Sequence, residues 1–133
     1  LDNFGNVDGS IVINNSTTTY NTSSDYRLKE NEVLISNGIE RLKQLKPYRF
    51  NWKRNPSITL DGFFAHEAAT VVPEAVTGTK DAVVTQSMVD AGEYTSDKLD
   101  QEIHQGIDQS KLVPLLVAAV QELTAKVEAL EAA

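Results

Sequence analysis

The most regular pattern of apolar and polar residues lies near the C-terminus of the chain. There, apolar positions recur at alternating spacings of three and four: Val113, Leu116, Val120, Leu123, Val127 and Leu130. This spacing is typical of the apolar seam of a coiled coil, here nearly three heptads long. Pro114 fits a helix only in its first turn, so the helix is predicted to begin between Ser110 and Val113 and to cover about residues 111–131. Because so short a seam is marginal alone, we expect an oligomer supported by a globular part.

A second helical pattern precedes an alternating one in the middle of the chain. Four apolar residues share one face of a predicted amphipathic helix: Ile35, Ile39, Leu42 and Leu45. Pro47 is predicted to end this helix near Lys46. Aromatic and polar residues then alternate over residues 48–53, which predicts a strand whose aromatic face belongs to the core rather than to a ligand platform. Turn residues at 54–62 and a short return strand at 63–65 complete a predicted hairpin.

The next stretch gives weaker patterns. A helical turn is predicted over residues 66–72, ahead of Pro73, followed by a loop with a brief strand up to Gly78. Residues 80–105 are the least regular part of the chain. Within them, residues 81–89 have strand character, and the following residues 95–106 fit a short helix closed by Gly106.

The N-terminal stretch has a different composition. Residues 1–23 contain twelve Ser, Thr or Asn and only two charged residues. Ile11–Ile13 and Thr17–Tyr20 are β-forming runs that predict strands. These runs cannot bury enough apolar surface alone, so they predict strands that need neighbours, as in an elongated repetitive β structure. The first ten residues lack a signal-peptide pattern and an initiator Met, and we expect them to be the cut end of a longer polypeptide.

Composition and charge exclude several classes of protein. The 133 residues suit one domain with an appended segment, and the apolar and charged contents are those of a globular chain. The net charge is −7, and residues 54–133 carry five Lys or Arg against thirteen Asp or Glu, which argues against a nucleic-acid surface. The chain has no Cys, so disulfides and thiolate chemistry are excluded. No apolar run is long enough for a membrane span.

One candidate for chemistry combines Ser24 with Lys29, where the polar segment ends. A serine hydroxyl becomes a nucleophile when a base removes its proton, and a neutral amine can be that base. Five residues is too far for a contact along a straight strand, so a turn at residues 25–28 is required. From the pattern alone, a loop serine beside a solvated lysine is the more common situation.

Other arrangements of polar residues are weaker. His66 and Glu67 lack the third convergent ligand of a metal site, since the other histidine, His104, lies in the irregular region. A hydrogen-bonded or capping role suits His66 better. A Ser-His-Asp triad lacks a nucleophile-elbow glycine pattern. The carboxylates between Asp97 and Glu102 lack the spacing of a calcium loop, and a solvated face is expected there. Neither a metal nor a cofactor is predicted.

Four segments, taken in order, resemble one known family. They are SSDYRLKENE, IERLKQLKPYRFNWK, GFFAHEAATVVPEAVTG and IDQSKLVPLLVAAVQELTAKVEAL. Together they resemble the C-terminal intramolecular chaperone domain of phage tail fibres, tailspikes and endosialidases, also called the peptidase S74 domain. The resemblance covers residues 23–133 except for 80–105. Its most specific part is the S-D-x-R-x-K motif, formed here by Ser24, Asp25, Arg27 and Lys29.

The resemblance implies a fold, a partner and an activity. The fold is α+β: a small domain of helices and short strands over residues 25–133 with a C-terminal coiled-coil helix, preceded by the end of a β-stranded fibre at residues 1–24. The implied partners are two further copies, in a homotrimer, and the upstream fibre of the same chain. Valine and leucine in the seam positions favour a coiled coil of two helices. We still expect a trimer, because the globular part can set the number of chains.

The implied activity is self-cleavage, a single cut in cis after the fibre has assembled. Ser24 corresponds to the nucleophile and Lys29 to the general base, while Arg27 and Glu67 occupy matching positions without an assigned role. The family pattern favours the bond between Ser24 and Asp25. Attack by Ser24 Oγ on its own carbonyl would close a strained four-membered ring, and attack on the Ser23 carbonyl a five-membered one. A water activated by Lys29 is a third route, and we predict cleavage at Ser24–Asp25.

Two other functions remain open at this point. One is a fibre-tip module that trimerises, stays attached and contacts a host receptor. The other is an ordinary hydrolase with a separate substrate. For the favoured function, the expected location is a virion tail fibre or spike precursor assembled in the host cytoplasm, with no nucleic-acid, membrane or small-molecule partner. Residues 80–105 are candidates for an extension that embraces the upstream fibre.

Overall fold

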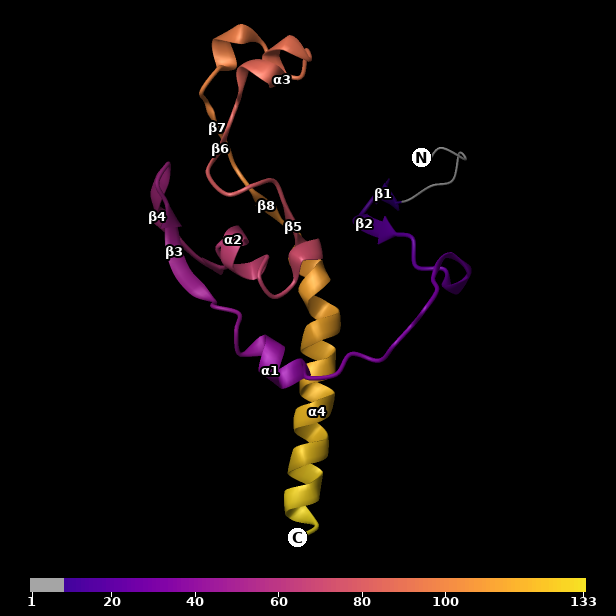
Figure 1. Cartoon of the computed structure of the whole chain (residues 1–133). Coiled ribbons are helices and arrows are strands. Elements are labelled where there is room, and N and C mark those ends of the chain that lie inside the picture. The colour runs from indigo at the N-terminus through magenta and orange to yellow at the C-terminus, as the bar shows by residue number, and fades with distance from the viewer. Residues whose placement is uncertain (1–8) are drawn as a thin grey trace. The chain divides into compact units, whose positions relative to one another are not determined.

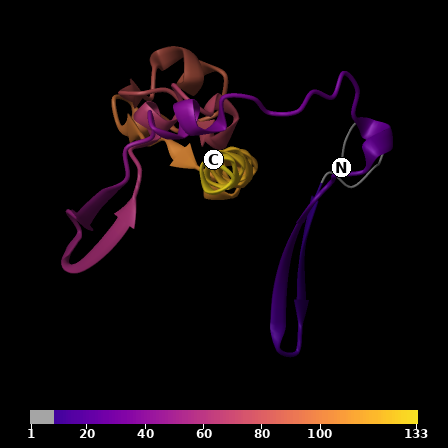
Figure 2. The ribbon, with the colours of Figure 1, turned by 90° about the horizontal axis from the view of Figure 1, so that it is seen from below.

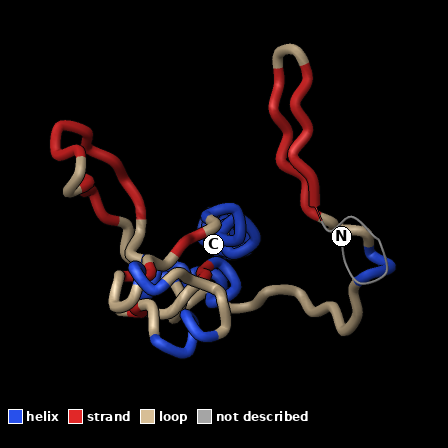
Figure 3. The backbone as a smooth tube through the Cα atoms, turned by 90° about the horizontal axis from the view of Figure 1, so that it is seen from above, coloured by secondary structure: helices blue, strands red, loops and turns tan. Residues whose placement is uncertain are grey.

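The computed structural model describes residues 9–133, which fall into two compact units that divide between Leu34 and Ile35. The described residues form helices and short antiparallel strand pairs (Figure 3). The longest of these helices is at the C-terminus. This arrangement confirms the predicted α+β class. The predicted boundary between residues 24 and 25 concerns where the chain is cut, and it stays a prediction.

The first unit contains a β-hairpin. Strand β1 (Gly9–Asn14) pairs antiparallel with β2 (Thr17–Thr22), so that Ile11 faces Tyr20 across the ladder. This confirms the two strands predicted from the polar segment; the rest of the predicted stub, residues 1–8, lies outside the described residues. Every residue of both strands is exposed. The hairpin therefore lacks a core of its own within the described chain.

The second unit is built around α4 (Val113–Glu131), the longest helix in Figure 1. A short 3-10 helix, η4 (Gln109–Leu112), leads into it, and Pro114 lies in the first turn, as predicted. Leu115 and Ala119 on one face of α4 are buried. The six seam residues lie on other faces and are 44 to 76% exposed. The helix thus uses one apolar face inside the unit and leaves the predicted coiled-coil seam open.

A short helix, α1 (Gly38–Leu42), lies against α4 (Figure 1). The sequence predicts a longer helix that includes Ile35, and this is wrong: Ile35 precedes the helix and is exposed. The helix cannot extend in that direction because Asn37 adopts a left-handed conformation with φ of 59°. At the start of α1, the Ile39 N–H donates to Glu122 Oε2 of α4 at 3.1 Å.

Gly38 lets the two helices approach backbone to backbone. A Cβ atom at this position would lie 2.6 Å from the Ala119 N atom and 2.8 Å from the Ala118 carbonyl carbon. Atoms of that kind cannot come so close, and the helical backbone of α4 cannot move aside as a flexible side chain would. The missing side chain of Gly38 is therefore what permits this contact.

Gly38→Ala is expected to destabilise the second unit by about 1–3 kcal/mol, because the added methyl group must push α1 away from α4. The free energy of unfolding from denaturant titration, measured at fixed protein concentration, checks this. Glu40→Ala in the same helix is the control, since Glu40 is exposed and its replacement should change stability by less than about 0.5 kcal/mol. Equal stabilities for the two variants would contradict the proposed close contact.

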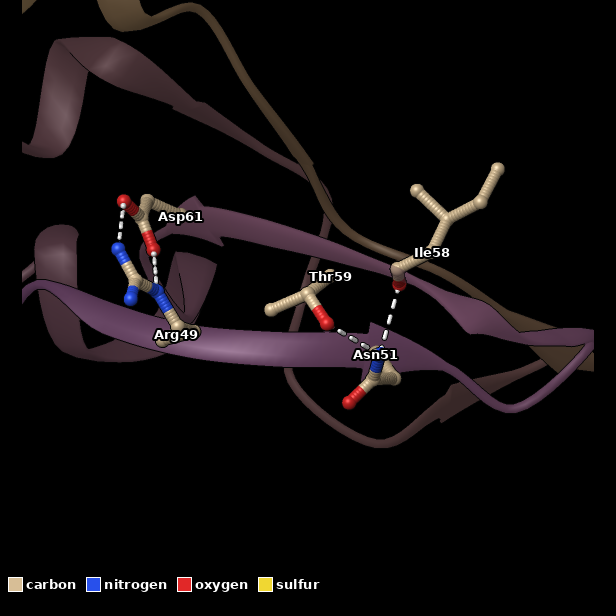
Figure 4. Close-up of polar contacts among 5 residues, drawn as sticks. All are labelled: Arg49, Asn51, Ile58, Thr59 and Asp61. Atoms are coloured by element: carbon tan, nitrogen blue, oxygen red, sulfur yellow. Dashed lines mark hydrogen bonds and ion pairs between the residues drawn. The ribbon is translucent and has the colours of Figure 1, made fainter.

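A second hairpin carries the aromatic residues. Strand β3 (Tyr48–Trp52) pairs with β4 (Asn55–Gly62), and the hairpin projects from the elements around α4 (Figure 2). The predicted hairpin is confirmed, but the position of its return strand is wrong. The sequence predicts a turn at residues 54–62 and a strand at 63–65, whereas residues 55–62 form β4 and the turn is at residues 53–54. One side of the ladder is polar (Figure 4). Arg49 donates to both carboxylate oxygens of Asp61 at 2.9 and 3.1 Å, and Asn51 bonds Ile58 O and Thr59 Oγ1.

The aromatic side of this hairpin is not part of the buried core. Tyr48 and Phe50 are half-buried, and Trp52 is 59% exposed. The prediction of a core strand is therefore wrong for Trp52, because the end of a projecting hairpin has few neighbours to cover it. The core lies elsewhere in the unit, and its buried cluster is formed by Val71, Val72, Ala75, Leu112 and Leu115.

The elements after the hairpin surround this core and then leave it. Helix α2 (Ala65–Ala68) and the 3-10 helix η2 (Pro73–Ala75) confirm the helical turn and loop predicted here. The brief strand is β5 (Val76–Thr77), which pairs with β8 (Gly106–Ile107).

Residues 80–105 form an arm whose two sides pair with one another. Strand β6 (Ala82–Val83) pairs with β7 (Glu102–Ile103), and helix α3 (Gln86–Asp90) lies beyond them in Figure 1. The strand predicted over residues 81–89 is right only for its first residues, since Thr85 caps α3 by accepting from the Met88 N–H. The helix predicted up to Gly106 shrinks to the 3-10 turn η3 (Ser96–Lys98).

Candidate functional site

A single tight turn follows the first hairpin. Asp25 begins the 3-10 helix η1 (Tyr26–Leu28), and its side chain accepts a hydrogen bond from the Arg27 N–H at 2.9 Å. The Leu28 N–H donates to the Asp25 carbonyl oxygen, and the Lys29 N–H to that of Tyr26, both at 3.1 Å. An aspartate before a helical turn commonly satisfies free N–H groups in this way. The sequence S-D-Y-R-L-K thus reverses the chain within a few residues.

The turn brings Lys29 back to Ser24. Lys29 Nζ donates a hydrogen bond to Ser24 Oγ at 2.8 Å. The expectation that residues 25–28 would form a turn is confirmed, and it explains how two residues five positions apart come into contact. Both side chains are exposed in the chain as described. A hydroxyl and an amine at this distance can exchange a proton directly, without an intervening water.

Arg27 and Asp25 form a second pair within the same turn. Arg27 Nε donates to Asp25 Oδ1 at 2.9 Å, and Nη2 donates to Oδ2 at 2.7 Å. The guanidinium therefore binds both carboxylate oxygens in the bidentate (two-pronged) geometry that is common for these two groups. The Arg27 side chain, and then its backbone N–H, lower the pKa of Asp25 below its ordinary value. The carboxylate in turn raises the pKa of Arg27.

Glu67 belongs to the second unit, where it lies on α2 and is half-buried. Lys46 Nζ donates to Glu67 Oε1 at 3.1 Å, and this contact is the main cause that lowers the pKa of Glu67. Glu67 Oε2 is buried without a partner in hydrogen-bonding geometry. The Tyr48 hydroxyl is nevertheless near enough for the carboxylate to raise its pKa. Lys46, Tyr48 and Glu67 therefore form a polar cluster at the base of the β3–β4 hairpin.

The two histidines, which are far apart in the sequence, line one surface pocket together with Asp81 and Glu102. His66 is exposed and stacks on Phe64 with ring centroids 6.0 Å apart. His104 lies 3.9 Å from its neighbour Glu102. In residues 9–133, no group of three or more His, Asp or Glu side chains is arranged to hold a metal ion. The carboxylates between Asp97 and Glu102 are exposed, as expected of a solvated face.

Two of these contacts were not anticipated from the sequence. The Asp25–Arg27 pair could have been predicted from the sequence. An aspartate two residues before an arginine, within a required turn, can cap the turn and bind the guanidinium. The Lys46–Glu67 pair has no comparable signal, since the partners are 21 residues apart and belong to different elements.

Comparisons with known proteins bear on the family. A search of curated proteins finds no match to the chain. Within the described residues, no helix combines the length and apolar character needed to cross a membrane. The model of the Peptidase_S74 family, described as the chaperone of endosialidase, matches residues 24–77. The description of this family model supports a chaperone role for the chain. The matched segment begins at Ser24 and includes Lys29 and Glu67, and this match bears out the resemblance that the sequence motifs indicate.

Proposed function

We propose that this chain is an intramolecular chaperone that trimerises, aligns an upstream β-stranded viral fibre or spike, and then releases itself by cleavage between Ser24 and Asp25. The observation that carries the proposal is the 2.8 Å contact between Lys29 Nζ and Ser24 Oγ. It lies at the first residues of the segment that matches a chaperone family. The pair supplies a hydroxyl and a base at the junction between a β-stranded segment and the rest of the chain.

The proposed reaction is the hydrolysis of one peptide bond. Neutral Lys29 accepts the proton of the attacking oxygen and returns a proton to the leaving amine as the C–N bond breaks. Overall, one water adds across the bond, leaving a carboxylate on the upstream fragment and an amine on the downstream one. In the structure Lys29 donates to Ser24, and to act as the base its amine must instead accept the proton of the attacking oxygen.

The identity of the attacking oxygen decides which bond breaks. If Lys29 activates a water that Ser24 helps to position, the Ser24 carbonyl carbon is attacked and the downstream fragment begins at Asp25. If Ser24 Oγ attacks the Ser23 carbonyl carbon through a five-membered ring, an ester forms after the C–N bond breaks. Hydrolysis of that ester gives a fragment that begins at Ser24. We favour the first outcome, in agreement with the S-D pattern.

Trimer formation would control this reaction. The single chain leaves Ser24 and Lys29 exposed, and water around an amine favours its charged form. Cover by neighbouring chains would remove that water and favour the neutral form. The exposed seam of α4 supports such assembly, because Val120, Leu123 and Leu130 are each more than half exposed. Apolar residues at heptad spacing are stabilised when they pack between helices.

The same assembly serves the upstream fibre. The β1–β2 hairpin is exposed on every residue and needs neighbouring strands to be stable. Holding three chains together at one end reduces the entropy lost when distant strands find their register. Cleavage then removes the template, so that the folded fibre persists because it unfolds slowly. The proposed setting is a virion tail fibre or spike precursor assembled in the host cytoplasm.

A time course on the full wild-type chain tests the proposal. Native mass spectrometry is expected to find a trimer, and intact mass spectrometry two fragments whose masses sum to that of the parent plus one water. The downstream fragment is expected to begin at Asp25; one beginning at Ser24 would replace the first route with the ester route. A confirmed trimer that stays intact on prolonged incubation would contradict self-cleavage and favour a fibre-tip module that remains attached.

A further inference from the structure

Arg27 has the most complete set of contacts in the turn that follows Ser24. Its backbone N–H and two guanidinium nitrogens all donate to the carboxylate of Asp25, at 2.7 to 2.9 Å. Asp25 is also the residue that caps η1 and follows Ser24 directly. A contact between two neighbouring surface residues would ordinarily have little consequence. Here the Asp25 carboxylate caps η1, and this turn brings Lys29 to Ser24.

We propose that Arg27 is a positioning residue, whose grip on Asp25 holds the 3-10 turn in the form that places Lys29 on Ser24. This inference rests on the function proposed above. The path of the chain supports it: the capping bond to Asp25, the two backbone bonds of the turn and the Lys29–Ser24 contact occur within six consecutive residues. A change in the cap therefore alters the position of Lys29 directly.

Arg27 has a second effect, which is electrostatic. The Asp25 carboxylate carries a negative charge beside Ser24, and an ammonium group prefers a carboxylate to a neutral hydroxyl. Because Arg27 occupies both oxygens of Asp25, Lys29 is left to bond Ser24. Without Arg27, the carboxylate would compete for Lys29 and stabilise its charged form, which cannot act as a base.

The test is the rate of self-cleavage of full-length Arg27→Ala. The first-order rate constant is expected to fall by about 10- to 100-fold, the size of effect produced by a misplacement near 1 Å at a reacting group. Added methylguanidinium should restore part of the rate by binding Asp25 in the space left by the arginine. Arg27→Lys should recover less than the wild-type rate, because lysine lacks the planar two-pronged geometry.

The chain provides a matched control in the second unit. Arg49 grips Asp61 through the same two-pronged geometry, at 2.9 and 3.1 Å, and both side chains are exposed (Figure 4). Arg49→Ala should cleave at the wild-type rate and show no response to methylguanidinium. If Arg27→Ala also cleaves at the wild-type rate, the positioning role is wrong. A slow Arg27→Ala chain that methylguanidinium does not accelerate would likewise overturn it, since the loss would then come from general misfolding.

A measurement without cleavage separates this inference from the function on which it rests. An uncut wild-type trimer would contradict the proposed function alone. NMR titration of the Asp25 carboxyl carbon then decides about Arg27: the pKa should lie below its ordinary value in the wild-type chain and return to that value in Arg27→Ala. The same titration in both chains would overturn the proposed grip of Arg27 on Asp25.

Discussion

The Ser24→Ala and Lys29→Met chains are expected to stay intact under conditions in which the wild-type chain is split. Alanine removes the hydroxyl that lies 2.8 Å from Lys29 Nζ, and methionine keeps most of the lysine side chain but has no amine to accept a proton. General-base catalysis contributes about 10²–10⁴-fold to a rate, so Lys29→Met should be slower by about that factor. Ser24→Ala loses the oxygen that either positions the water or attacks the carbonyl carbon, and it should also stay intact over the same period. Intact mass spectrometry over time measures the remaining parent chain.

The controls for this experiment come from the second hairpin. Ser57→Ala and Lys53→Met remove a hydroxyl and an amine from exposed positions and should cleave at the wild-type rate. Circular dichroism and native mass spectrometry should show the same secondary structure and oligomer for all five chains. Cleavage of Ser24→Ala at the same bond and rate as wild type would show that the Ser24 hydroxyl has no catalytic role. The same result for Lys29→Met would show this for the Lys29 amine.

Leu123→Asp is expected to dissociate the proposed trimer. Leu123 is 54% exposed in the single chain and lies in the middle of the α4 seam. Burying a fully exposed leucine contributes about 1.5–3 kcal/mol, and Leu123, already partly covered in the single chain, would gain roughly half of that in each copy. Each carboxylate placed there without a partner costs more. These costs apply to all three copies, so the midpoint concentration for assembly should rise by several orders of magnitude. Analytical ultracentrifugation over a range of concentrations measures this shift.

A control on the same helix separates assembly from folding. Ala125→Asp introduces the same charge on an exposed residue outside the seam, and this variant should remain a trimer. The Leu123→Asp monomer should keep its α1–α4 packing, because Gly38 and Ile39 contact Ala118, Ala119 and Glu122 on a different face. Loss of self-cleavage in the folded Leu123→Asp monomer would link cleavage to assembly. Cleavage of that monomer at the wild-type rate would contradict the link.

Local patterns in the sequence predicted several elements correctly. The start of α4, the β1–β2 strands and the aromatic strand β3 were all found at the expected positions. Each depends on residues within a few positions of one another: a proline in a first turn, runs of β-branched residues, or alternation along a strand. The turn required between Ser24 and Lys29 was likewise predictable, since their separation excludes a direct contact along a straight strand.

Errors arose where distant contacts override local preference. The apolar spacing that begins at Ile35 favours a helix, yet α1 begins only at Gly38 because Asn37 before it is left-handed. Gly38 then packs against the backbone of α4. The return strand β4 was read as a turn because Asn, Pro, Ser, Asp and Gly residues are common in turns. Pairing with β3 holds this segment extended instead. In the arm, a two-residue strand and α3 replace the longer predicted strand.

The sequence by itself thus determined the heptad seam of α4, the strands of the β1–β2 hairpin and the pairing of a hydroxyl with an amine at Ser24 and Lys29. Only the tertiary structure decided that α4 uses a separate face to pack on α1, and that Lys46 pairs with Glu67. The reason is physical. Periodicity and turn preferences act between neighbours in the chain, whereas the choice of a packed face or an ion partner depends on which distant residues the whole fold brings within a few ångströms.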